Sequence, residues 1–111
     1  MTSYFKGLVS EYIVMTIYCL SFHKILYHRY KNKMGEIDII ARKNNTIIFI
    51  EVKFRRNDID DILCSNYQKQ RIISAAKVFL QSKPKYQSYD VRFDCCIIKP
   101  FRLPYIIKNA W

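Results

Sequence analysis

The stretch Thr46-Ile-Ile-Phe-Ile-Glu-Val-Lys53 is apolar until it ends in charge. A continuous apolar strand is usually buried on both faces, as in the centre of a sheet, so we expect a central strand over these residues. Glu51 is unusual within it, because a buried carboxylate is costly unless it is paired, protonated or bound to a metal. The stretch therefore predicts the middle of a sheet and a functional carboxylate on it.

A second strand, Glu36–Arg42, comes before this one, and Asn44-Asn45 between them predicts a tight turn. Asparagine tolerates the positive φ that such turns require. With the turn at these residues, Asp38 lies opposite Glu51 in an antiparallel hairpin, and opposed side chains are about 5 Å apart. Lys53 shares a face with Glu51, because side chains two residues apart in a strand point the same way.

The rest of the chain predicts two helices and two further strands around this hairpin. The elements are a helix over Ser3–Ser21, a strand over Ile25–Tyr30, a turn over Lys31–Gly35, a loop over Phe54–Cys64, a helix from the capping box Ser65-Asn-Tyr-Gln68 to Pro84, and a strand over Tyr89–Ile98. Residues 105–111 are too few to assign. The order helix, three strands, helix, strand predicts a single α/β or α+β domain over residues 1–111.

The chain of 111 residues has 19 Lys+Arg against 9 Asp+Glu, a formal net charge of +10. This charge predicts a polyanionic partner, either a nucleic acid or an acidic membrane surface. The longest apolar run, Tyr12–Phe22, is too short for a membrane span, which needs about 20 residues. No small-residue cleavage site follows the run, so we expect no signal peptide and a cytoplasmic protein that does not enter a membrane.

Cysteines and histidines give no sign of a metal site. None of the cysteines has CxxC spacing, which argues against a zinc site and a disulfide framework. The four cysteines are Cys19, Cys64, Cys95 and Cys96. We expect them to be small buried hydrophobic residues in a reducing cytosol. His23 and His28 lack metal-site spacing, and we expect ordinary surface or packing roles for both.

Two carboxylates about 5 Å apart repel each other, so either one pKa rises or a cation is recruited. Oxygen ligands favour Mg²⁺, with Mn²⁺ as a substitute. Lys53 beside Asp38 and Glu51 can orient a water or stabilise developing negative charge. These three residues and one metal ion suffice to hydrolyse a phosphodiester. A cross-strand ion pair on a solvated sheet face has the same spacing, so the motif leaves that alternative open.

Basic residues flank the acidic pair in the sequence, which suits a nuclease because phosphates must be attracted to a site that is itself negative. The candidate nucleic-acid-binding residues are Lys31, Lys33, Arg42, Lys43, Arg55, Arg56 and Arg71. A metal-dependent nuclease is the first hypothesis. A non-catalytic basic nucleic-acid-binding module explains the charge equally well. A basic protein bound to a membrane surface or to RNA leaves the acidic pair unexplained.

Several strings in the chain, taken together, resemble one family over nearly the whole length. They are Gly7-x-x-x-Glu11, Lys24-Ile-Leu-x-His-Arg-Tyr30, Gly35-Glu-Ile-Asp-Ile-Ile-Ala41, Phe49-Ile-Glu-Val-Lys53 with Arg55, Gln70-Arg71-Ile72, Arg92-Phe-Asp94 and Ile107-Lys-Asn-Ala-Trp111. The family is the YraN-like family of bacterial proteins (uncharacterised protein family 0102). Its usual glycine and proline after the Glu-x-Lys motif are absent here, which leaves substrate preference open.

The YraN-like family is placed in the restriction-endonuclease-like superfamily, whose motif is written PD-(D/E)xK. Its layout is related to that of archaeal Holliday-junction resolvases. The resemblance implies an α-β-β-β-α-β core with a central mixed sheet flanked by helices. It also implies an Mg²⁺-dependent endonuclease that hydrolyses phosphodiester bonds in branched or structured DNA. Analogy with enzymes that cut two strands is compatible with a homodimer, and the sequence itself specifies no interface.

The resemblance further implies a role for each site residue. Asp38 and Glu51 would bind the metal, with the backbone carbonyl of Val52 as a third ligand. Lys53 would position the attacking water. Glu11, on the first helix, would complete the acidic site as a further metal ligand. Glu36, beside Asp38 at the rim, would have a structural or a supporting role. Gln70 would be either a polar contact near the site or a solvated helix residue.

Overall fold

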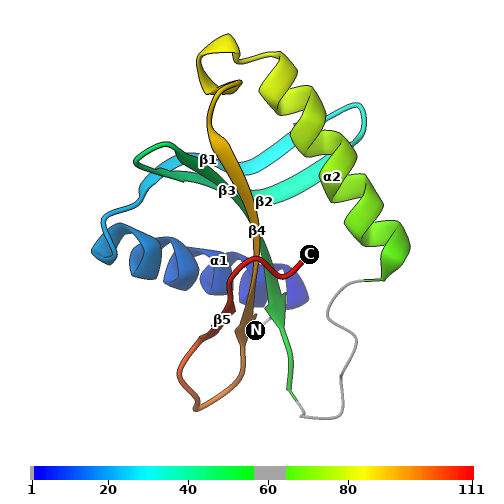
Figure 1. The fold of residues 1–111 in the computed structure, drawn as a ribbon. Helices are drawn as coiled ribbons and strands as arrows, with labels where there is room; N and C mark the ends of the chain where they lie inside the picture. The colour runs from blue at the N-terminus through cyan, green and yellow to red at the C-terminus, as the bar shows by residue number, and fades with distance from the viewer. Residues whose placement is uncertain (1, 57–64) are drawn as a thin grey trace.

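The computed structural model describes residues 2–56 and 65–111 (Figure 1). Its elements are α1 (Ser3–Leu20), β1 (Lys24–Asn32), β2 (Gly35–Lys43), β3 (Thr46–Phe54), α2 (Asn66–Gln81), a 3₁₀ turn η1 (Pro84–Tyr86), β4 (Asp90–Ile98) and β5 (Tyr105–Ile107). The predicted order of helix, three strands, helix and strand is confirmed. The addition is β5, a short strand in the tail that was too short to assign from the sequence.

The five strands form one mixed sheet in the order β1-β2-β3-β4-β5. β1, β2 and β3 form an antiparallel meander, β4 lies parallel to β3, and β5 returns antiparallel along β4. The parallel step requires a long connection, because a tight turn cannot join the ends of parallel strands. α2 lies in that connection, so the α/β class with a central mixed sheet flanked by helices is confirmed.

β3 is buried on both faces, as its apolar sequence predicts. Ile47 and Phe49 pack in a cluster on the α2 side of the sheet, with Phe79 of α2. Ile48 and Ile50 pack on the opposite side, in a cluster with Val14 of α1. Each helix therefore covers one face of the sheet, and β3 runs through the middle of both cores (Figure 1).

The helix ends follow local sequence signals. The hydroxyl of Thr2 accepts a 3.1 Å hydrogen bond from the Phe5 amide and caps α1. The hydroxyl of Ser65 accepts a 3.1 Å hydrogen bond from the Gln68 amide, so the predicted cap of α2 is present. α2 ends at Gln81, before Pro84, because proline cannot continue the helix. None of the helices in residues 2–56 and 65–111 is both long and apolar enough to cross a bilayer.

The cysteine expectation holds for two of the three cysteines that the structure describes. Cys95 and Cys96 are buried in β4, whereas Cys19 is exposed, because it lies on the outer face of α1. Cys64 and the greater part of the predicted loop over Phe54–Cys64 lie outside the described residues. Phe54 itself belongs to β3.

Candidate active site

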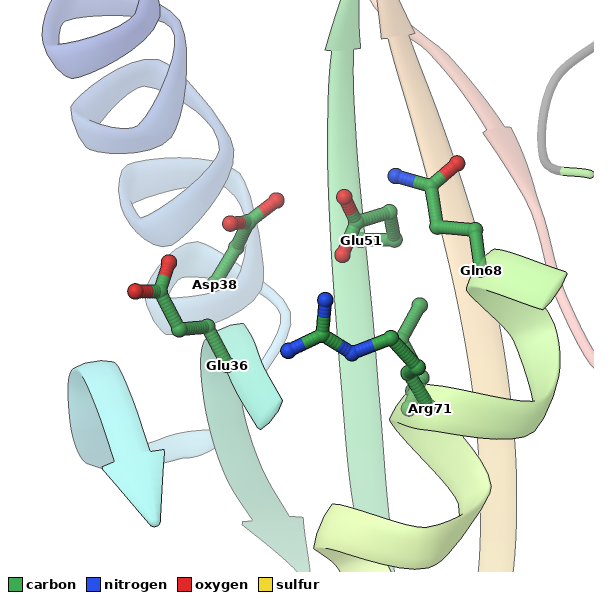
Figure 2. Close-up of a pocket in the computed structure, with 6 residues that line it drawn as sticks. Glu36, Asp38, Glu51, Gln68 and Arg71 are labelled. Carbon is green, nitrogen blue, oxygen red and sulfur yellow. The ribbon is translucent and has the colours of Figure 1, made fainter. Parts of the chain in front are cut away.

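Asp38 on β2 and Glu51 on β3 face each other across a cavity of about 320 Å³ on the α2 side of the sheet (Figure 2). The antiparallel pairing of β2 with β3 runs from Lys43↔Thr46 to Ile39↔Ile50. This register is the one predicted from the asparagine turn. It places Asp38 and Glu51 at the next position along the hairpin.

Asp38 lies where β2 departs from regular strand geometry. Its carboxylate accepts a 2.8 Å hydrogen bond from the backbone N–H of Val52. Ile37 packs on the α2 side and Ile39 on the α1 side, although a regular strand would send both to the same face. The side chain of Asp38 thus accepts a hydrogen bond from a backbone amide of β3 at the point where the pairing of β2 with β3 ends.

The irregularity continues on β1. Pairing with β2 includes Tyr30↔Ile37 and His28↔Ile39, which leaves Arg29 beside Asp38 between two paired positions. Arg29 has φ +56°, in the left-handed region that residues other than glycine seldom occupy. Backbone strain of this kind concentrates at functional sites, so it supports a function for the surroundings of Asp38.

Burial and mutual repulsion set the charge of the pair. Glu51 is 9% exposed, and burial together with the nearby Asp38 carboxylate raises the pKa of Glu51 to about 8, while Lys53 opposes the rise. Burial also raises the pKa of Asp38. The hydrogen bond from the Val52 amide acts in the opposite direction, because it favours the charged carboxylate. The two carboxyl groups therefore share a proton near neutral pH, a state that a bound cation would replace.

Lys53 lies beside the pair. Its Nζ is 3.3 Å from Glu51 Oε1, and its side chain is 14% exposed. The two residues are separated by one position on β3, so their side chains share a face. The structure thus brings together Asp38, Glu51 and Lys53, the three residues that the hairpin pattern singled out.

Glu11 approaches the pair from the other side of the sheet. It lines a second cavity of about 350 Å³ with Asp38 and Glu36, and its charge contributes to the raised pKa of Asp38. Two basic partners hold it: His28 Nε2 at 2.6 Å and Arg29 Nε at 2.9 Å. His28 is expected from the sequence to have a surface or packing role, and the structure adds an ion pair with Glu11 to that role. His28 and Arg29 position Glu11, and the sequence signal for them was the string Lys24-Ile-Leu-x-His-Arg-Tyr30.

Both cavities include Asp38 and Glu36. Glu36 is itself largely exposed, with Lys31 Nζ 3.6 Å from its Oε1. Asp38 is thus reached from the cavity beside α2 and from the cavity beside α1. Glu36 stands at the shared rim, as expected from its place beside Asp38 in the sequence.

The first turns of α2 contribute Gln68 and Arg71 to the cavity of the pair (Figure 2). Gln70 is exposed and does not line it. Helical periodicity gives the reason, because Gln68, Arg71 and Ile72 are three and four residues apart and share one face of α2. Ile72 is a core residue of α2, and its position in the sequence therefore favoured Gln68 over Gln70 as the glutamine that lines the cavity.

Arg71 extends from α2 toward the carboxylates (Figure 2). Gly35, at the start of β2, lies against it. A Cβ added to Gly35 would come within 3.4 Å of the Arg71 carbonyl oxygen and 3.6 Å of its Nε. These separations are ordinary van der Waals contacts, so Gly35 marks the point where β2 packs directly against Arg71 of α2.

The other basic residues predicted to bind nucleic acid are spread along the hairpin. Lys31 lines the second cavity and Lys33 is exposed in the turn before β2. Arg55 and Arg56 follow the end of β3. Arg42 and Lys43 lie at the opposite end of the hairpin, next to its turn, where Arg42 donates to the Asn44 carbonyl at 3.0 Å. Lys31 and Arg71 are thus the two of this set that line the cavities of the pair.

The donor set around the pair fits a hard cation. The predicted ligands, which are the Asp38, Glu51 and Glu11 carboxylates and the Val52 carbonyl, would offer oxygen only, which is the preference of Mg²⁺, but Glu11 lies on the α1 side, in the second cavity. Among residues 2–56 and 65–111, no three His, Cys, Asp or Glu side chains gather closely enough to enclose a metal ion. A magnesium site built on the pair would accordingly take its remaining ligands from backbone and water, as Mg²⁺ usually does.

Comparison with known proteins identifies relatives across bacteria. The chain is 40% identical over 91 residues to a UPF0102 protein of Nitrobacter winogradskyi, covering 80% of this chain and 76% of that one. It is 42% identical over 92 residues to a UPF0102 protein of Fusobacterium nucleatum, with the same coverage. A UPF0102 protein of Mesorhizobium japonicum is 31% identical over 110 residues, covering 98% of this chain and 88% of the relative.

One solved structure, the crystal structure of SSO0001, is similar with a TM-score of 0.49 and 19% sequence identity. That match covers 98% of this chain, which spans about half (53%) of the other. The model of the uncharacterised protein family UPF0102 matches residues 10–98, which include Glu11, Asp38, Glu51 and Lys53. The chain belongs to the uncharacterised protein family UPF0102.

Proposed function

We propose that this protein is a metal-dependent nuclease that hydrolyses phosphodiester bonds in DNA at the Asp38–Glu51 pair. The observation that carries the proposal is the pair itself. The buried carboxyl group of Glu51 and the half-buried one of Asp38 face one cavity, and Lys53 Nζ lies 3.3 Å from Glu51. Holding two such groups together is unfavourable unless a proton or a cation lies between them. The net charge of +10 would attract the phosphates of a nucleic acid to this negative centre.

Each residue then has a chemical role. Asp38 and Glu51 would hold Mg²⁺ with the Val52 carbonyl, and Glu51 would release its proton as the ion binds. When bound, the ion would supply activation of a water and polarisation of a phosphoryl oxygen. Lys53 would hold the attacking water near Glu51 and stabilise negative charge that develops on the phosphate.

Arg71 and Glu11 would act at the edges of the reaction. The Arg71 guanidinium points into the cavity and offers paired donors that match a phosphate (Figure 2). Glu11 lies in the second cavity and is held by His28 and Arg29. Its carboxylate would orient water around the ion from the α1 side.

The proposed substrate is branched or structured DNA, and the proposed assembly is a homodimer. Both rest on the family resemblance, whose layout is related to that of junction resolvases, and a dimer would place one site on each of two strands. The substrate class is tested by comparing duplex, single-stranded and four-way-junction DNA of equal length under the same conditions.

The decisive test is cleavage of these DNAs by the purified protein with Mg²⁺, with Mn²⁺ and with EDTA. We expect metal-dependent cleavage by the wild type, and a loss of at least about 100-fold in Asp38→Asn and Lys53→Ala, as is usual for groups that act in the transition state. The matched control is Asp90→Asn, an exposed aspartate at the start of β4. It should cleave like the wild type.

Two outcomes would contradict a nuclease. Equal cleavage by wild type and Asp38→Asn, with or without metal, would identify a contaminating enzyme. Tight, salt-dependent binding without cleavage in any metal would instead support the alternative, a non-catalytic basic nucleic-acid-binding module.

A further inference from the structure

An apolar groove lies on the α1 side of the molecule, apart from the acidic pair. It has a volume of about 510 Å³ and lies between α1, the end of β3 and the segment that follows β4. Ile13, Phe54 and Phe101 contribute apolar surface to it. The volume is in the range of about 300–1,000 Å³ typical of sites for small molecules. The groove is therefore large enough to receive a flat ring system.

Phe101 is held in the groove in an energetically unfavourable state when no ligand is bound. It is fully exposed, with a relative accessibility of 107%. Its backbone has φ +58°, a conformation that is a genuine outlier for a bulky side chain. Exposure of a large aromatic ring and left-handed backbone both cost free energy, and no packing of the ring offsets either. This combination favours a ligand that covers the ring.

The charges around the groove narrow the chemistry of that ligand. Lys6 and Arg56 line it, and none of its lining residues within 2–56 and 65–111 is acidic. The Lys6 ammonium lies 5.7 Å from the centre of the Phe54 ring. A complementary ligand therefore combines anionic groups with apolar, stackable surface. Nucleotides have both properties, because each phosphate is followed by a base with a π-face.

We propose that this groove binds unpaired nucleotides of the nucleic-acid substrate, with a base stacked on Phe101 and adjacent phosphates held by Lys6 and Arg56. The inference rests on the proposed function for the choice of a nucleic acid as ligand. Bases in a duplex are covered by their neighbours, so an exposed ring can stack only on a base that is unpaired or splayed out.

The position of the groove relative to the pair supports a shared substrate. β3 carries both Glu51 and Phe54, and α1 carries both Glu11 and Ile13. Pairing between β2 and β3 reaches Ile50, while pairing between β3 and β4 continues to Phe54. The β2 side of β3 is thus unpaired with β2 beyond Ile50. Glu51 and Phe54 are about 10 Å apart along β3 at the rise of a β-strand, and a single strand that leaves the acidic pair would pass around this edge to reach the groove on the α1 side.

The test measures binding without cleavage, in EDTA and in an Asp38→Asn background. The probes are a fluorescein-labelled dT₁₂ and a 12-base-pair duplex, followed by anisotropy. Phe101→Ala should weaken dT₁₂ binding about tenfold, within the range for one lost stacking contact, and duplex binding less than about twofold. Phe101→Trp should restore dT₁₂ binding. Leu103→Ala is the matched control, because Leu103 is 91% exposed nearby and does not line the groove.

A second variant tests the phosphate contact. Lys6→Gln should reduce the slope of log affinity for dT₁₂ against log salt by about 0.7, the change expected for one lost contact to a single strand. Phe101→Ala should leave that slope unchanged.

Three results would overturn the proposal that the groove binds unpaired nucleotides. The first is an unchanged dT₁₂ affinity in Phe101→Ala, and the second is an equal loss of affinity for dT₁₂ and for the duplex. The third is displacement of labelled dT₁₂ by polyglutamate or anionic vesicles at a lower concentration of charge than unlabelled dT₁₂ requires. Because cleavage plays no part in the measurement, the two proposals fail separately. A protein that never cleaves DNA but shows the Phe101-specific loss retains the groove and rejects the nuclease. A protein that cleaves DNA in a metal-dependent way but shows no effect of Phe101→Ala supports the nuclease and rejects the groove.

Discussion

The carboxylate of Asp38 accepts a 2.8 Å hydrogen bond from the backbone N–H of Val52, the residue next to Glu51. This bond ties the side chain of one strand to the main chain of the other at the point where their ladder ends. It holds the Asp38 carboxylate in place beside Glu51 despite the repulsion between the two groups. Loss of this acceptor would separate the strands further and disperse the pair.

The raised pKa of Glu51 predicts an unusual dependence of stability on pH. Between the ordinary glutamate value of 4.5 and about 8, the folded protein keeps a proton that the unfolded chain has released. Unfolding therefore releases a proton, and the free energy of unfolding falls as pH rises through this window. Glu51→Gln carries no such proton. It should be more stable than the wild type by on the order of 2 kcal/mol at pH 9, and equal to it at pH 4.

This difference is measured by urea unfolding at pH 4 and pH 9 in EDTA. Asp90→Asn provides the control for removal of one exposed carboxylate. A Glu51→Gln variant that is destabilised at pH 9 would contradict the buried, proton-sharing pair.

Mg²⁺ should reverse the effect in the wild type. A cation that binds only the folded protein stabilises it by about 2.7 kcal/mol at 100 times its dissociation constant. We therefore expect the melting temperature of the wild type at pH 8 to rise with Mg²⁺ or Mn²⁺, and that of Asp38→Asn and Glu51→Gln to stay constant. Thermal scans against metal concentration check this, and a rise of equal size in all three proteins would place the ion elsewhere.

Arg29 provides a test of the backbone beside the site. Replacing it with alanine removes the guanidinium that pairs with Glu11 Oε1 at 2.9 Å but keeps a side chain at φ +56°. Replacing it with glycine removes the same partner and relieves the left-handed strain. Arg29→Gly should therefore be more stable than Arg29→Ala by about 1 kcal/mol, against the usual trend for glycine in strands. Chemical denaturation of the two variants compares them directly, and a less stable glycine variant would refute the strained geometry.

Asp94 should be essential for folding rather than for the site. It is fully buried, and its carboxylate accepts hydrogen bonds from the Tyr18 hydroxyl at 2.7 Å, from Arg92 Nε at 2.9 Å and from the Asn109 amide at 3.0 Å. Asp94→Ala leaves these buried donors without this acceptor and removes the ion-pair partner of Arg92, whose side chain is 25% exposed. We expect a loss of about 3–5 kcal/mol in the free energy of unfolding. Asp90→Ala, an exposed carboxylate four residues earlier on β4, should lose less than about 1 kcal/mol.

Local sequence signals determined much of this protein. The asparagine turn and the period of two along a strand give the register that brings Asp38, Glu51 and Lys53 together. The apolar run of β3 gives its place in the middle of the sheet. The Ser65 cap gives the start of α2. These features depend on residues that are close in the chain, so a single sequence is enough to predict them.

Packing between distant elements decided the rest. Glu11 finds His28 and Arg29 only because α1 packs against β1, and no spacing in the sequence specifies that contact. The short β5 forms because β4 offers it a partner, although its own residues are too few to indicate a strand. The break at Asp38 and the groove around Phe101 likewise depend on how neighbouring elements end. The sequence by itself determined which residues could make the pair, and tertiary packing decided its burial, its shared proton and the surfaces that surround it.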